Sequence, residues 1–168
     1  MSKLIGAELP KDLYQRLQGR DLESYSDKVI LLSTVDVNGW PHLAMLSYFE
    51  VVAKNEREVR LATYKDTSTT NNMRRNGKAT LAIIDERVAV YIKGSITEIK
   101  PQMNCAPENA KLSMKVEQVI ADEANEEYEP GAYVSSGVTY RNPNRMAEML
   151  KARAILNELL QDEAVKAA

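Results

Sequence analysis

The sequence has little cysteine and little histidine. Among 168 residues there is one cysteine, Cys105, and one histidine, His42. One cysteine cannot form an internal disulfide, which fits the reducing cytoplasm. No cluster of histidine, cysteine and carboxylate residues shows metal-ligand spacing, and one histidine gives no nucleophile–base pair. We interpret His42 as a surface or packed residue and Cys105 as an unreactive thiol.

Long apolar runs are also missing. No segment approaches about 18 consecutive apolar residues, and residues 1–10 lack an apolar stretch of signal-peptide length. We therefore expect a cytoplasmic protein that neither crosses a membrane nor carries a standard export signal. The formal net charge of −2 supplies no basic face for nonspecific nucleic-acid binding.

The composition is that of an ordinary globular domain. Apolar residues make up 44% of the chain and charged residues 27%, the range of soluble domains. A chain of this length buries enough surface to hold a core without disulfides. We found no internal repeat and no low-complexity linker, so we expect a single domain over residues 1–168.

Short strands and turns dominate the middle of the chain. The pair Asn38-Gly39 predicts a hairpin after a β-branched run. The return strand is apolar on both faces, so we expect it to be covered on both sides, which predicts a homodimer. The expected strands are 29–35, 41–53, 59–64, 79–84, 88–99 and 132–140. The expected helices are 10–20, 66–76, 107–128 and 143–161.

This pattern predicts a mainly β fold with flanking helices. Six strands at hairpin spacing with few crossovers favour an antiparallel barrel, over residues 28–141, rather than a doubly wound sheet. Helix 107–128 is predicted from an apolar stripe that includes Leu112, Val116 and Val119. Gly94, inside strand 88–99, suggests a bulge or a close backbone approach.

The most informative segment follows the strand 59–64. Lys65 and Asp66 lead into four consecutive hydroxyl residues at a helix start, Thr67-Ser68-Thr69-Thr70. The free N–H groups of a first helical turn bind anions, and the hydroxyls and Lys65 add donors and charge, so a phosphate cradle is one interpretation. Ordinary helix capping, with Gly77 as the stop, explains the same residues. No glycine-rich phosphate loop is present.

The order of these elements resembles a known family. The stretches D-x-N-G-x-P at 36–41, T-S-T-T-N-N-M-R-R-N-G-K at 67–78 and Y-I-K-G-S-I at 91–96 are similar to those of the pyridoxamine 5′-phosphate oxidase-like FMN-binding split barrels. The resemblance covers about residues 29–99. It implies a six-stranded split β-barrel with FMN in a groove between two subunits of a homodimer.

The resemblance also implies which residues contact the flavin. The return strand would run along the isoalloxazine and offer it backbone groups, and the strand 88–99 would approach from the other subunit. From the residues alone, Tyr91 and Lys93 either line such a groove or are simply exposed. The implied flavin-facing positions are Ala44, Met45, Leu46, Ser47, Thr63, Asn72, Tyr91 and Lys93.

The phosphate positions depart from the family pattern. Thr67, Ser68 and Thr69 fall where the family binds phosphate, but the oxidases carry arginine and lysine where this chain has Ser68 and Thr69. Charge here comes from Lys65, with Arg74 or Arg75 nearby. Charge-assisted hydrogen bonds are about twice as strong as neutral ones, so we expect weaker phosphate binding.

The end of the chain departs from the family as well. The Arg/His substrate motif of the oxidases is missing, since a helix without histidine follows Arg141. The resemblance therefore implies a divergent FMN-dependent oxidoreductase acting on a small redox substrate, not a pyridoxamine phosphate oxidase. The alternative is a noncatalytic or stress-related binding protein of the same fold, with weak flavin, deazaflavin or haem binding.

Overall fold

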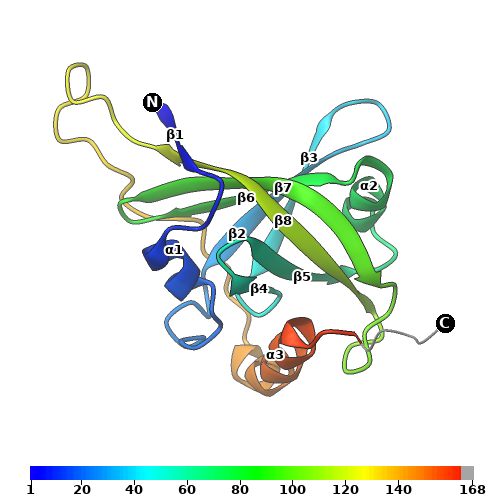
Figure 1. Cartoon of the computed structure of the whole chain (residues 1–168). Helices are drawn as coiled ribbons and strands as arrows, with labels where there is room; N and C mark the ends of the chain where they lie inside the picture. The colour runs from blue at the N-terminus through cyan, green and yellow to red at the C-terminus, as the bar shows by residue number, and fades with distance from the viewer. Residues whose placement is uncertain (164–168) are drawn as a thin grey trace.

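The computed structural model describes residues 1–163 and shows one curled antiparallel sheet with three helices (Figure 1). The predicted domain continues to residue 168, and residues 164–168 lie outside the described part. The strands are β1 (Ser2–Gly6), β2 (Val29–Val35), β3 (Pro41–Ser47), β4 (Val51–Asn55), β5 (Glu58–Tyr64), β6 (Lys78–Asp85), β7 (Val88–Lys100) and β8 (Asn109–Asp122). The helices are α1 (Lys11–Arg16), α2 (Ser68–Asn76) and α3 (Arg145–Leu160).

The strand order is β3-β2-β6-β7-β8-β5-β4, with β1 added alongside β8. Every strand pair is antiparallel. The two end strands, β3 and β4, are consecutive in the chain and are separated only by residues 48–50. The sheet therefore curls until its ends meet at one seam, which is the predicted split barrel with eight strands instead of six.

The predicted helix 107–128 is wrong, because this segment forms β8. Leu112, Met114 and Val116 are buried at a spacing of two, and burial resumes at Val119. Lys93 pairs with Gln118 but Gly94 pairs with Val116, so one extra residue, Glu117, bulges from β8. The bulge shifts the alternation by one position, and the buried residues then resemble a helical stripe.

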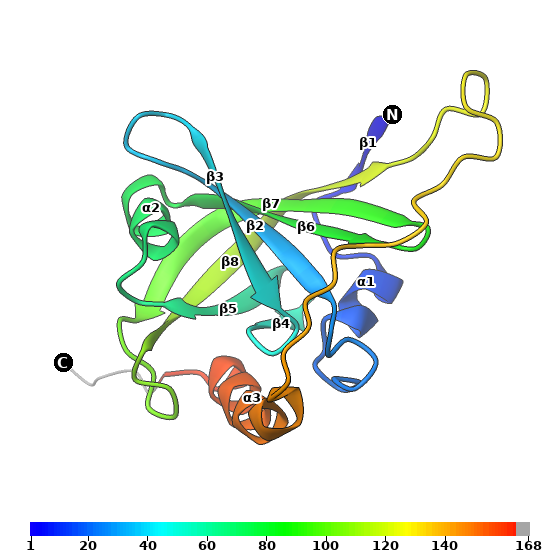
Figure 2. The same ribbon diagram turned by 180° about the vertical axis from the view of Figure 1, so that it is seen from behind.

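The helix expected at 10–20 is shorter, because α1 ends at Arg16, and three other parts of the fold differ more from the prediction. Residues 132–140 form no strand, although Thr139 makes an isolated bridge with Lys28 and Val134 accepts from the N–H of Arg87, as the segment passes outside the sheet toward α3 (Figure 2). The return strand 41–53 breaks into β3 and β4, because Ser47 donates both its backbone N–H and its hydroxyl to Glu50 Oε2, each at 2.8 Å, in a tight turn. β1 was not predicted, because only its pairing with β8 makes it a strand.

The local turn predictions are confirmed. The side chain of Asp36 accepts hydrogen bonds from the N–H groups of Asn38 and Trp40, and Gly39 adopts φ 84° to close the β2–β3 hairpin. At Gly94, a Cβ atom would lie 2.2 Å from the carbonyl oxygen of Lys115. Only glycine allows β7 to approach β8 this closely at the bulge.

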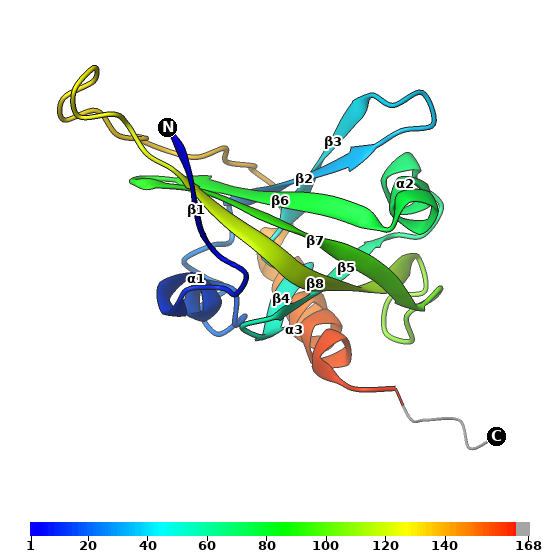
Figure 3. The ribbon, with the colours of Figure 1, turned by 45° about the horizontal axis from the view of Figure 1, so that its top comes forward.

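Two hydrophobic clusters divide the interior. The larger one fills the barrel, where Leu13 and Leu17 from the α1 segment and Met73 from α2 meet the inward side chains of the sheet. The smaller cluster lies outside the barrel, where α3 packs across β4 and β5 (Figures 1 and 3). In α3, Ile155 and Leu159 face this cluster. Within residues 1–163, the helices lack the length and apolarity needed for a membrane crossing.

A buried lysine of β8 holds the end of α3. The Lys111 side chain is 0% exposed, and Nζ donates to the carbonyl oxygens of Glu158 and Gln161, both at 2.7 Å, and pairs with Glu163 at 3.0 Å. Arg60 of β5 also donates to the carbonyl of Gln161. The last carbonyls of a helix have no partners within the helix, so these cations satisfy them. The position of α3 therefore depends on β5 and β8.

We expect Lys111→Met to lower the free energy of unfolding by about 1–3 kcal/mol, because it removes the charged hydrogen bonds from a buried ammonium to the carbonyls of Glu158 and Gln161. Urea denaturation followed by circular dichroism measures this change. Lys115→Met, at an exposed position of the same strand, is the matched control and should change stability by no more than about 0.5 kcal/mol. Equal effects of the two substitutions would contradict the role given to Lys111.

Candidate functional site

The start of α2 is built by a chain of hydroxyl groups. Thr67 caps the helix, as predicted, since its Oγ1 accepts from the N–H of Thr70. The same hydroxyl donates to the carbonyl of Tyr64 at 2.9 Å. Thr70 donates to that carbonyl at 2.8 Å and lies 2.7 Å from the hydroxyl of Thr63. Gly77, in the left-handed conformation, ends the helix. Capping is therefore present, and it locks α2 onto β5.

Several predicted flavin-facing residues serve this anchoring within one protomer. The Thr63 side chain is buried and engaged with Thr70. Asn72 is also buried; its amide donates to Thr34 at 3.0 Å and accepts from Arg75 at 3.2 Å. Their polar atoms thus have partners inside the protein. Ser68, by contrast, is exposed at the first turn.

The positive charges around α2 are only partly neutralised. Arg74 forms an ion pair with Glu98 at 2.6 Å. Lys65 donates instead to the neutral Gln102 at 2.8 Å, and Arg75 donates to the carbonyl of Val35. Both cations thus have neutral hydrogen-bond partners, but only Lys65 lies beside the helix start, since Arg75 belongs to the last turn of α2. Together with the free N–H groups of the first turn, Lys65 forms a donor set that suits an anion.

The outer face of the sheet brings other predicted residues together. The strand register places Met45 opposite Leu31, Leu31 opposite Ala82, and Ala82 opposite Tyr91. Neighbouring strands lie about 4.8 Å apart, so Met45 and Tyr91 lie on one face about three strand spacings apart. Tyr91 donates to Asp122, and desolvation together with this carboxylate raises the pKa of Tyr91.

Much of this face is apolar and exposed. Leu43 is 65% exposed and Met45 is 59% exposed, whereas Ala44 and Leu46 alternate toward the inner side. β3 is also an end strand of the sheet, so one of its edges carries backbone groups that no strand within residues 1–163 pairs. Lys93 is exposed on β7, beside Tyr91. The region offers apolar surface, backbone donors and acceptors, and one cation.

A hollow of about 370 Å³, which we call the α3 hollow, lies between β3, the end of β5, the start of β8 and α3. It includes the predicted residues Met45, Leu46 and Ser47. The opposite wall was not predicted, because it combines segments that are remote in sequence and is fixed only when α3 packs on the sheet. Its charged members are Glu50, Glu108, Arg145, Glu148 and Lys151.

The charges of the α3 hollow are largely paired. Arg145 lies with its guanidinium carbon 4.6 Å from the Phe49 ring centre and pairs with Glu148 at 2.9 Å. Lys151 pairs with Glu108, which raises the pKa of Lys151 and lowers that of Glu108. Burial raises the pKa of Glu50, although its hydrogen bonds from Ser47 oppose the shift.

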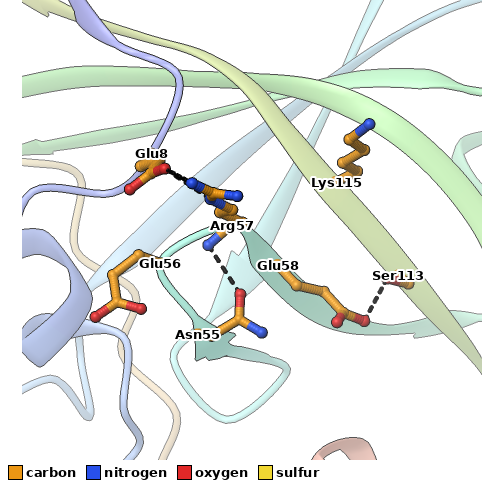
Figure 4. A pocket seen from close by; sticks show the side chains of 7 residues that line it. All are labelled: Glu8, Asn55, Glu56, Arg57, Glu58, Ser113 and Lys115. Atoms are coloured by element: carbon orange, nitrogen blue, oxygen red, sulfur yellow. Dashed lines mark hydrogen bonds and ion pairs between the residues drawn. The ribbon is translucent and has the colours of Figure 1, made fainter.

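A second hollow, of about 670 Å³, is open to solvent beside β1 and the β4–β5 turn (Figure 4). Its polar side chains are mostly engaged with one another: Arg57 pairs with Glu8, Asn55 accepts from the N–H of Arg57, and Glu58 accepts from Ser113. We find no catalytic arrangement there. Over residues 1–163, no three histidine, cysteine or acidic residues come together as metal ligands.

Comparison with known proteins agrees with this architecture. Residues 22–132 match the sequence profile of the pyridoxamine 5′-phosphate oxidase family. The chain is 31% identical over 112 residues to the uncharacterized protein YclD of Bacillus subtilis, covering 67% of this chain and 73% of that one.

Solved structures of low sequence identity share the fold. A candidate pyridoxamine 5′-phosphate oxidase from Lactobacillus delbrueckii has a TM-score of 0.53 at 17% identity, covering 71% of this chain and 98% of that one. An FMN-binding protein from Syntrophomonas wolfei has a TM-score of 0.51 at 14% identity, covering 68% and 92%. The fold and the profile match over more than half of the sequence lead to the same result: the chain belongs to the pyridoxamine 5′-phosphate oxidase family of split barrels.

Proposed function

We propose that this protein is an FMN-dependent oxidoreductase that holds its flavin between two copies of the chain. The observation that carries the proposal is the exposed apolar face of β3, with Leu43 and Met45, together with the anion-suited start of α2. The flavin would supply the redox chemistry when bound, and the protein would bind and orient it. Nothing in this role requires a catalytic histidine or metal.

The donor set at α2 fits a phosphate group. Ser68 and Thr69 lack the charge that arginine and lysine supply in the family's oxidases, but Lys65, beside the helix start, has a neutral partner and keeps its charge available. A phosphate at the helix start would also accept from the free N–H groups of the first turn. We therefore assign Lys65, Thr67, Ser68 and Thr69 to the phosphate end of the site.

The flavin ring fits the outer face. The unpaired edge of β3 would offer backbone groups around Ala44, Met45, Leu46 and Ser47, as the family resemblance implies. The side chain of Met45 would lie against the ring. On β7, the half-buried Tyr91 and the exposed Lys93 would belong to the approach from the second subunit. Thr63 and Asn72 would support the site by anchoring α2 instead of contacting the flavin through their side chains.

In this proposal the substrate is a small molecule other than pyridoxamine 5′-phosphate. The segment after Arg141 forms α3 and contains no histidine, so the substrate-binding Arg/His motif of the oxidases is missing. A cytoplasmic location is part of the proposal, and the single cysteine supports it.

One observation favours a second candidate, a noncatalytic binding protein with weak flavin, deazaflavin or haem binding. Ser68 and Thr69 are neutral where the oxidases are charged. Haem usually requires an axial ligand, and His42 is the only histidine that could serve. Cofactor extraction with mass measurement separates the candidates. Protein that stays colourless after incubation with excess FMN would reject the flavoprotein proposal.

We expect Ser68→Asp to weaken FMN binding at least about tenfold, since a carboxylate beside the phosphate repels it. An acidic residue in the first turn is favourable for a helix, so the fold should be retained. Fluorescence titration of the apoprotein with FMN measures the dissociation constant.

Riboflavin, which lacks the phosphate, is the matched ligand, and its affinity should be the same for wild type and Ser68→Asp. Ser68→Ala removes only the hydroxyl and should change FMN affinity much less than Ser68→Asp. An unchanged FMN dissociation constant in Ser68→Asp would remove the start of α2 from the site.

We also expect the wild-type protein to sediment as a dimer of the 18.9-kDa chain and Leu43→Glu to shift it toward the monomer, because the substitution places a charge within the exposed apolar face. FMN affinity should fall with the dimer. Leu150→Glu, at an exposed leucine of α3 away from this face, is the control and should leave the dimer intact. A monomeric wild-type protein would contradict the proposed groove.

A further inference from the structure

We propose that the α3 hollow binds a compact apolar molecule that carries one cationic nitrogen, with the Glu50 carboxylate as its ionic partner. As a binding site the hollow stands by itself. As the substrate subsite of an oxidoreductase it rests on the proposed function, because the hollow borders the strand β3 along which we place the flavin.

One wall of the hollow lies outside the part of the chain that matches the family profile. That match ends at residue 132, whereas α3 and the residues before it contribute Tyr140, Asn142, Arg145, Glu148 and Lys151. The opposite wall comes from the family's barrel strands. The hollow is therefore a feature that this chain adds to the common fold, and its ligand need not be the family's phosphorylated substrate.

The arrangement of charge favours a cation. Both positive side chains of the hollow, Arg145 and Lys151, are already paired with carboxylates, Glu148 and Glu108. Glu50 is the remaining acidic residue of the lining. Counting these five groups leaves one negative charge, so an anionic ligand would meet no free cation, whereas a cationic ligand would meet a carboxylate.

The Glu50 carboxylate is held in place through one of its two oxygens, and the other oxygen remains available to a ligand. Its Oε2 accepts both hydrogen bonds from Ser47 at 2.8 Å, which orients the carboxyl group. Its Oε1 makes no hydrogen bond to the described residues, and no buried side-chain oxygen among them lacks a partner. Oε1 is therefore not sealed off, and Glu50 lines the hollow. A preoriented carboxylate in a partly desolvated site favours an ion pair.

The remaining lining suits the body of such a ligand. Met45, Leu46 and Ile155 supply apolar contact. Tyr64 and Tyr140 both line the hollow and are at least half exposed. An aromatic face attracts a cationic nitrogen through its quadrupole, and the attraction is larger where water is excluded. Apolar walls, aromatic faces and one carboxylate together define the expected ligand class.

The test compares three probes of the same size that differ in charge: benzylamine, benzyl alcohol and benzoate. Each is titrated into ¹⁵N-labelled full-length protein, and binding is followed by the backbone amide shifts of residues around the hollow. We expect benzylamine to bind at least about tenfold more tightly than benzoate. Glu50→Gln should remove about tenfold from benzylamine affinity and change benzyl alcohol affinity less than about twofold.

Glu50→Gln keeps an amide oxygen for the Ser47 hydrogen bonds, so the β3–β4 turn should survive. Glu56→Gln, on the exposed β4–β5 turn, is the control and should bind benzylamine like wild type. Equal affinity for benzylamine and benzoate, or benzylamine binding unchanged by Glu50→Gln, would overturn the inference.

FMN titration of the same samples separates this inference from the proposed function. Loss of benzylamine binding in Glu50→Gln with normal FMN affinity supports both. Benzylamine binding by a wild-type protein that takes up no FMN would leave the cation site in place and reject the flavoprotein proposal.

Discussion

The pairing of β8 on both of its edges is the constraint on which the rest of the structure depends. β8 hydrogen-bonds to β7 along one side and to β5 along the other, and β1 continues the β5 side beyond residue 118. Its bulge bends the sheet, because the extra residue increases the local twist. The same strand supplies Lys111, which holds the end of α3, and its first residue lines the α3 hollow. The curvature of the barrel and the position of α3 therefore both depend on β8.

This constraint also explains what could be predicted from the sequence. The β2–β3 hairpin is local: Asp36, Asn38 and Gly39 determine it almost alone, and it was predicted correctly. β8 could not be predicted, because its burial alternation changes phase at Glu117 and only the partner strand reveals the bulge. β1 has no pattern of its own and becomes a strand only through pairing. The turn at Glu50 also escaped prediction, since two apolar strands flank it without a glycine or proline.

The candidate site also has one part that the sequence predicts and one part that only the folded structure reveals. The start of α2 was predicted because the hydroxyl residues that can cap it, Thr67 to Thr70, are consecutive in the sequence. The structure adds that Thr67 and Thr70 are used internally while Ser68 is exposed, a distinction that depends on where Tyr64 places its carbonyl. The α3 hollow was missed because its walls come from β3, β5, β8 and α3. No spacing rule relates Glu50 to Arg145, and only packing brings them into one hollow.

The two regions beside β3 carry opposite unbalanced charge. Near α2, Lys65 and Arg75 have neutral partners, so positive charge remains available. In the α3 hollow, the cations are paired and Glu50 keeps a free oxygen. A dianionic cofactor tail and a cationic substrate would therefore be attracted to different ends of one region, and each would be disfavoured at the other end. The unpaired edge of β3 borders this region. The flavin and the cationic substrate that we propose would therefore both contact β3, one held from the α2 side and the other from the α3 hollow.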